Sequence, residues 1–214
     1  MKKISSLLVA AVLAGAAVAA QAQDNVFKIG VTRYDTHAKT NGITGIGVPP
    51  GADAKVGDAT TVILVYERLF GPNFGAELVM GIPPTIKTKA SGSVEFLNAT
   101  GTVLEVENWA PTLLFNYHFF EPGATWRPYV GVGINYTQFR NAKSSISDDV
   151  KVGSSWGPAA QVGIDYAITK DISAFASFAY VKVKSKVVAS GATVLETTVD
   201  YRPTVYSAGV SYRF

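Results

Sequence analysis

Hydrophobic and polar positions alternate along most of this chain with a period of two residues. The last ten residues, VYSAGVSYRF, show the pattern, because aromatic or apolar side chains alternate there with small or polar ones. This period is typical of a β-strand with two unlike faces, and no long stretch repeats with the helical period. The pattern therefore predicts an all-β protein whose last residues form a strand.

Eight segments of about ten residues carry the alternation. They are residues 26–34, 60–68, 74–82, 108–119, 127–139, 156–168, 172–184 and 201–214. Long and short connections alternate along the chain, so all the long ones lie at one end of the sheet. We predict an eight-stranded antiparallel transmembrane β-barrel with short periplasmic turns and long extracellular loops. A soluble β-sandwich or lipocalin-like barrel is the alternative, but it gives no reason for this asymmetry.

The two faces of the predicted strands differ in chemistry. One face is apolar or aromatic, as a lipid-facing wall requires; its candidates are Leu113, Phe115, Tyr117, Phe119, Val130, Val132, Ile134, Tyr136, Val162, Ile164, Tyr166, Tyr206, Val210, Tyr212 and Phe214. The other face is charged or polar near the short turns, at Lys28, Glu77, Asn116, His118, Arg127, Asp165 and Arg213. Because buried charges have to be paired, we predict a plug of mixed charge across the lower lumen.

The upper lumen is predicted to be apolar. Its inward candidates include Val79, Leu114, Phe178 and Tyr180, with Lys182 and Lys184 at the outer rim. Five prolines lie at the outer ends of strands: Pro83, Pro84, Pro111, Pro158 and Pro203. Proline cannot donate to a ladder, so one hypothesis is a gap through which an apolar ligand leaves sideways into the membrane. The alternative is that these prolines merely end the strands where loops begin.

The N-terminus has the layout of a secretory signal peptide: Lys2 and Lys3, an apolar run from Leu7 to Ala20, and the cleavage motif Ala20-Gln21-Ala22. The run is too short for a transmembrane helix. We expect a signal peptide at 1–22 and one barrel domain at 23–214, exported to a bacterial outer membrane. Removing the two lysines lowers the formal charge from +3 to about +1, which gives no basis for nucleic-acid binding. The chain has no cysteine and hence no disulfide.

Few residues of this chain are candidates for catalysis. A barrel enzyme needs a histidine or paired carboxylates beside a nucleophile or an activated water. The two histidines are His37, in a predicted loop, and His118, at the periplasmic end of a strand. Asp148-Asp149 and the pair Asp53 and Asp58 lack the spacing of a calcium loop. We therefore predict no enzyme activity, no cofactor and no metal site.

Several blocks resemble the OmpW family of outer-membrane proteins, in family order over nearly all of residues 23–214. They are FGAELVMGIPP (74–84), WAPTLLFNYHF (109–119), RPYVGVGINYTQF (127–139), SWGPAAQVGIDY (155–166) and SAGVSYRF (207–214). The resemblance implies a narrow hydrophobic channel for small apolar molecules, including hydrocarbons in the AlkL branch. It also implies an apolar gate at Val79 and Trp156. Alternation places Trp156 outward, so that role would require Pro158 to shift the register.

Two functional hypotheses remain. The first is a passive channel for small hydrophobic molecules, with lumen contacts at Val79, Leu114, Trp156, Phe178 and Tyr180 and lateral exit to the bilayer. The alternative is a structural or adhesive barrel whose loops are a receptor for bacteriocin, phage or host ligand. Expected partners are apolar molecules, outer-membrane lipid and the barrel-assembly machinery, because Phe214 resembles the C-terminal aromatic residue that this machinery recognises.

Overall fold

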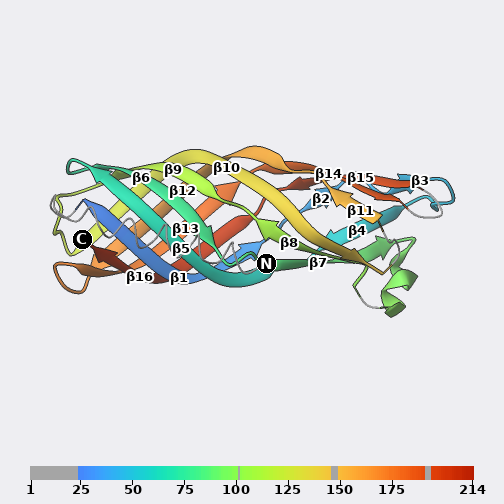
Figure 1. Cartoon of the computed structure of the whole chain (residues 1–214), viewed down its shortest axis with the longest axis horizontal. Helices are drawn as coiled ribbons and strands as arrows, with labels where there is room; N and C mark the ends of the chain where they lie inside the picture. The colour runs from blue at the N-terminus through green and yellow to red at the C-terminus, as the bar shows by residue number, and fades with distance from the viewer. Residues whose placement is uncertain (1–23, 101, 146–148, 191–193) are drawn as a thin grey trace, which may run out of the picture.

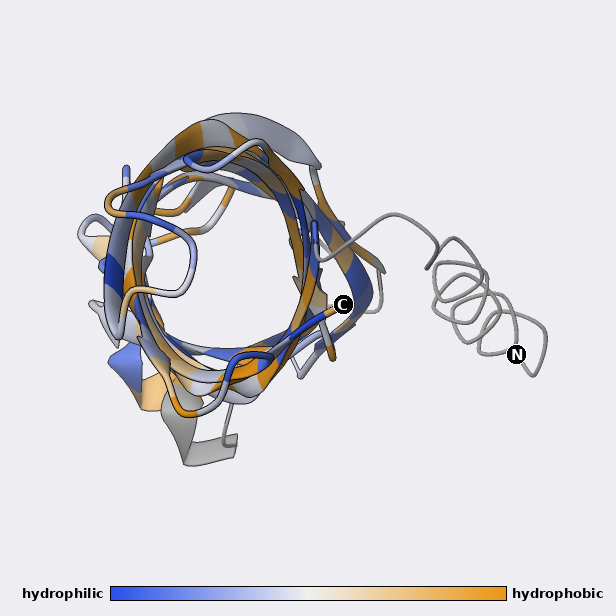
Figure 2. Ribbon diagram, turned by 90° about the vertical axis from the view of Figure 1, so that its left-hand side faces the viewer, coloured by the Kyte–Doolittle hydropathy of each residue, from blue (hydrophilic) through white to orange (hydrophobic). Residues whose placement is uncertain are grey.

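Eight long strands form a closed antiparallel barrel. The computed structural model describes residues 24–100, 102–145, 149–190 and 194–214, so the signal peptide expected at 1–22 lies outside the described residues. The barrel strands are β1 (Asn25–Asp35), β5 (Ala59–Phe70), β6 (Phe74–Gly81), β9 (Thr112–His118), β10 (Trp126–Ser144), β12 (Ser155–Ala167), β13 (Ile172–Val181) and β16 (Thr204–Arg213). Each pairs with the next in this order, and β16 pairs back onto β1. Figure 2 looks along the resulting ring. The barrel fold predicted from the sequence is thus confirmed.

The seam between the first and last strands is fully paired. Its register runs from Val26 opposite Arg213 to Asp35 opposite Thr204. Asn25 and Phe214 extend it by exchanging backbone hydrogen bonds of 3.1 and 2.9 Å. Gly209 lies at a close approach of the two strands, because a Cβ atom there would stand 2.1 Å from the Ile29 carbonyl oxygen. The final alternating segment is therefore the strand that removes the open edges of the sheet.

The long connections contain strands of their own, which the alternation analysis treated as loops. The strands β4 (Ala52–Val56), β7 (Thr85–Gly92) and β8 (Leu104–Trp109) continue the wall above β10, and the 3₁₀ helix η1 (Glu95–Thr100) follows β7. A second sheet comprises β2 (Lys39–Thr40), β3 (Thr44–Gly45), β11 (Asp149–Val152), β14 (Val183–Ser190) and β15 (Val194–Tyr201). Figure 1 shows that both sheets prolong the barrel beyond the end opposite the C-terminus. The extracellular end is thus a structured extension.

The outer surface of the barrel is an apolar band between two aromatic belts. Val132 and Phe115 in this band are 67% and 60% exposed. Near the short turns, Trp126 contacts Tyr166 with ring centroids 4.5 Å apart. Near the extracellular extension, Phe178 contacts Tyr206 at 5.3 Å. Such belts are typical of the two membrane interfaces of an outer-membrane barrel.

Helices are few in this fold. In the described part of the chain, none is long and apolar enough to cross a membrane.

The close approach at the seam gives a stability prediction. Replacing Gly209 with Val forces a side chain against the β1 backbone, and overpacking of this kind costs about 1–3 kcal/mol. We expect the free energy of unfolding in urea to fall by that amount. Ala208→Val is the matched control, because Ala208 is exposed on the outer face. Equal stability of the two variants would contradict the importance of this contact.

Candidate functional site

A network of buried charges fills the lower lumen. The Lys28 ammonium lies 3.1 Å from a Glu67 carboxylate oxygen and 2.9 Å from one of Glu77, and all three side chains are at most 3% exposed. The same ammonium lies 4.7 Å from the centre of the Tyr129 ring. Three strands, β1, β5 and β6, supply the charges. One cation thus pairs with two carboxylates where unpaired charges would be very costly.

Amide side chains and one histidine complete the hydrogen bonds of these carboxylates. Glu67 Oε1 accepts from Asn116 Nδ2 at 2.8 Å and lies 2.7 Å from His118 Nε2. Gln161 Nε2 lies 2.8 Å from both Glu77 Oε1 and Asn116 Oδ1. We call these six residues, Lys28, Glu67, Glu77, Asn116, His118 and Gln161, the polar floor. Gly131 leaves the space that the Asn116 amide occupies, since a Cβ there would lie 2.1 Å from Asn116 Oδ1.

The sequence-predicted plug residues divide into two groups. Lys28, Glu77 and His118 lie together in the polar floor. Arg127, Asp165 and Arg213 lie below it, around a periplasmic bowl with a volume of about 430 Å³. Arg127 donates a hydrogen bond to the Pro72 carbonyl, and Asp165 approaches His118 only to 3.9 Å. The predicted set is thus a floor with a polar vestibule beneath it.

Glu67 and Gln161 are floor residues that the sequence prediction missed. Both follow the inward alternation of their strands, Glu67 after Ile63 and Val65, and Gln161 after Ala159. The alternation along these two strands therefore already indicated that both residues face the lumen.

Above the floor the lumen is a narrow, largely apolar cavity of about 60 Å³. Lys28, Glu77, Tyr129 and Gln161 form its base. Val79 and Leu114 line its wall, as predicted from the alternation. The wall also includes Ile63, Val65, Ala159, Phe175, Ala179, Val181, Val183 and Val205.

The other three predicted lumen contacts are wrong, because these side chains lie on the outer face. Trp156 is 66% exposed and its ring contacts that of Tyr136 at 4.6 Å. Pro158 stays in register opposite Ile134, so it does not turn Trp156 inward. Phe178 and Tyr180 are 40% and 41% exposed. Their strand, β13, instead places Phe175, Ser177, Ala179 and Val181 inside.

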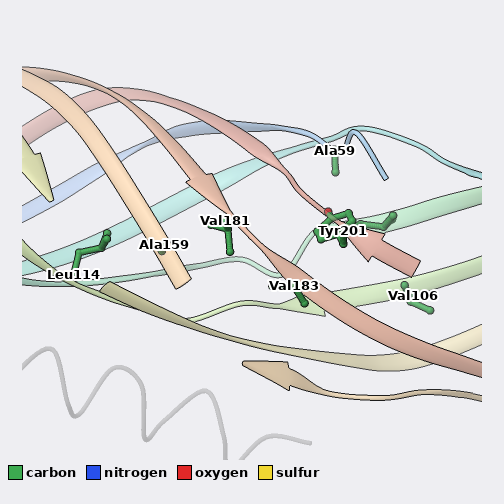
Figure 3. Packing of buried hydrophobic residues seen from close by; sticks show 8 residues of the cluster. Ala59, Val106, Leu114, Ala159, Val181, Val183 and Tyr201 are labelled. Atoms are coloured by element: carbon green, nitrogen blue, oxygen red, sulfur yellow. The ribbon is translucent and has the colours of Figure 1, made fainter. Parts of the chain in front are cut away.

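A second apolar cavity, of about 80 Å³, lies between the two sheets of the extracellular extension. Its walls include Val56, Ile86, Val106 and Val199. Tyr201 lines this cavity and also the luminal one. Figure 3 shows Tyr201 in one hydrophobic cluster with Val106 and Val183 from the extension and with Leu114 and Ala159 from the barrel. Burial raises the pKa of the Tyr201 phenol, so it stays neutral. The apolar interior therefore runs from the extension into the barrel.

A third cavity, of about 90 Å³, lies beside an interruption in the wall between β6 and β9. The ladder joining these strands ends at Val79 opposite Thr112, and the next backbone bond runs from Asn108 to the Pro84 carbonyl at 2.9 Å. No backbone hydrogen bond crosses between these two points among the described residues. Pro83, Pro84 and Pro111 line this interruption, which we call the lateral gap, while Pro158 lies within β12. Asn108 lines both the lateral gap and the luminal cavity.

Comparison with known proteins agrees with this geometry. The family model described as "OmpW family" matches residues 21–214. The chain belongs to the OmpW family. Outer membrane protein W of Salmonella typhi is 31% identical over 224 residues, covering 100% of both chains. The dibenzothiophene metabolism operon protein PahQ of Pseudomonas aeruginosa is 31% identical over 169 residues, covering 77% of this chain and 75% of PahQ.

The fold is also that of a solved outer membrane protein. The crystal structure of the outer membrane protein OprG from Pseudomonas aeruginosa superposes with a TM-score of 0.82 at 25% identity, covering 91% of this chain and 97% of OprG. Family and fold together place this OmpW-family member in the bacterial outer membrane. Recognition of Phe214 by the assembly machinery stays a prediction.

The polar floor gives a second stability prediction. Replacing Lys28 with Met leaves two buried carboxylates without their cation, which should lower the free energy of unfolding by about 3–5 kcal/mol. The control is Lys186→Met, because Lys186 pairs with Glu196 on the surface at 2.9 Å and such pairs contribute less than about 1 kcal/mol. Urea titration of protein in lipid vesicles measures both, and a Lys28→Met loss no larger than the control would show that the floor does not need its cation.

Proposed function

We propose that this protein is a passive outer-membrane channel for small hydrophobic molecules, which enter the apolar upper lumen from outside and leave sideways into the bilayer. The lateral gap is the observation that carries the proposal. At membrane depth an unpaired stretch of backbone is costly, and here it lies beside a cavity whose lining includes Ile63 and Val79 from inside the barrel and Met80 and Pro111 at the wall. A gap of this kind offers an apolar molecule a route from lumen to lipid.

The arrangement of the three cavities supports a continuous route. Tyr201 is shared by the extracellular and luminal cavities, and Asn108 by the luminal cavity and the lateral gap. The walls are mostly aliphatic, so an apolar molecule loses contact with water at the first cavity and stays out of water afterwards. Movement into the lipid then requires no return to water.

The polar floor gives the route its direction. An apolar molecule that reached Lys28 and Glu77 would have to separate charges that lie 2.9 Å apart and leave them without partners. The lateral gap involves no such cost, because no charged residue lines it in the described part of the chain. The floor therefore blocks passage to the periplasm and favours exit to the side. The name of PahQ, dibenzothiophene metabolism operon protein, links that relative to metabolism of an apolar compound, which fits the same class of cargo.

Filling the junction between lumen and gap tests the route. Ala110 lines both the luminal cavity and the lateral gap, so Ala110→Phe should reduce uptake of radiolabelled decane to that of empty vesicles. The vesicles carry lipopolysaccharide in the outer leaflet, and trapped albumin collects the tracer. Ala160→Phe, at an exposed position on the outer face of β12, should transport like the wild type. Wild-type uptake no greater than that of empty vesicles would instead favour the receptor role of the extracellular loops.

Opening the floor tests its role as a barrier. Glu77→Ala removes the carboxylate that holds Lys28 and Gln161, so the ion conductance of single barrels in a planar bilayer should rise. Glu196→Ala, on the exposed extension, should leave the conductance unchanged. If the wild type already conducts strongly and Glu77→Ala does not alter it, the floor is not the barrier.

A further inference from the structure

Two buried polar atoms on the apolar route have no hydrogen-bond partner among the described residues: the Tyr201 hydroxyl and the Asn108 side-chain oxygen. These residues are 4% and 3% exposed. Asn135, which lines the same cavity, shows the usual arrangement, because its amide donates to Thr112 Oγ1 at 2.8 Å and accepts from Thr137 at 2.6 Å. Buried polar groups are nearly always paired. An unpaired phenol and an unpaired amide oxygen in one cavity are therefore unusual.

Each of these two residues lines the luminal cavity and one neighbouring cavity as well. Tyr201 lies where the extracellular cavity meets the lumen, and Asn108 where the lumen meets the lateral gap. A molecule following the proposed route would pass Tyr201 first and Asn108 second. Both residues therefore lie at the junctions that every cargo has to cross.

The chemistry of the two atoms restricts what they can bind. A phenol hydroxyl donates a hydrogen bond readily, whereas an amide oxygen only accepts one. A hydroxyl group can accept from the first and donate to the second. Among the described residues that line the three cavities, the charged ones are Lys28 and Glu77, at the base of the lumen. An ionised head group at either junction would therefore have no opposite charge beside it, so it is disfavoured. The site is thus suited to a neutral hydroxyl in an otherwise apolar setting.

We propose that the preferred cargo is a hydroxylated hydrocarbon, whose hydroxyl group binds the Tyr201 phenol on entering the lumen and the Asn108 side-chain oxygen on leaving it. This inference rests on the proposed channel function. It adds a polar subsite to that channel and a preference for alkanols over alkanes of the same length. The apolar walls take the hydrocarbon chain, and the two polar atoms lower the cost of removing the hydroxyl from water.

The experiment compares decane with 1-decanol in the same asymmetric vesicles, at tracer concentrations far below saturation. Tyr201→Phe removes only the phenol oxygen, and Asn108→Leu replaces the amide with an apolar group of similar size. Each variant should lower the ratio of the 1-decanol rate to the decane rate by about fivefold, which is the factor that one neutral hydrogen bond provides. Tyr136→Phe is the matched control, because Tyr136 loses the same hydroxyl on the outer face.

The outcomes separate this inference from the channel function. If wild-type barrels transport decane and 1-decanol but both variants keep the wild-type ratio, the channel stands and the polar subsite is wrong. If neither tracer exceeds empty vesicles, the channel function fails and the subsite fails with it. Far-ultraviolet circular dichroism of each variant verifies folding, and the conservative Tyr201→Phe change keeps the test decisive if Asn108→Leu does not fold.

Discussion

A lipid bilayer offers no hydrogen-bond partner to a strand edge, so the backbone of this chain has to satisfy itself within the membrane. The pairing of β1 with β16 meets that requirement by turning an open sheet into a ring. Closure then divides the side chains of every strand between lipid and lumen. On β9, Phe115 and Tyr117 face the lipid while Asn116 and His118 face inward. The apolar wall and the polar floor are therefore two faces of the same strands.

The boundary between the polar floor and the apolar cavity falls between two consecutive inward-facing residues on each of three strands. The members of three pairs lie two positions apart: Glu77 and Val79 on β6, Asn116 and Leu114 on β9, and Gln161 and Ala159 on β12. In each case the residue nearer the periplasm joins the hydrogen-bonded network and the next inward residue lines the apolar cavity. Because the same step occurs on three strands that contribute to one network, the lining along each of them changes from polar to aliphatic over about 7 Å, the rise of two strand residues.

The sequence alone predicted some features of this structure and missed others. The period of two located all eight barrel strands, because lipid and lumen impose opposite polarity on neighbouring residues. It misplaced Phe178 and Tyr180, since both alternate sets of β13 contain apolar residues and only pairing with β16 decides between them. The extension was missed although Thr85–Gly92 alternates, with Ile86 buried and Lys87 exposed. The prolines at the strand ends suggested a gap, but its place between β6 and β9 and the unpaired atoms of Asn108 and Tyr201 depend on contacts between distant segments, which no local pattern contains.

The seam has a consequence for the order in which this protein is made and folded. Val26 pairs with Arg213, so the first strand obtains one of its two neighbours only when the last residues of the chain exist. Contacts between such distant residues form slowly, and until then both edges of the sheet remain open to wrong partners. Synthesis of the last strand therefore precedes closure of the ring. Until that strand is present, the wall has two unpaired edges whatever the order in which its other strands meet.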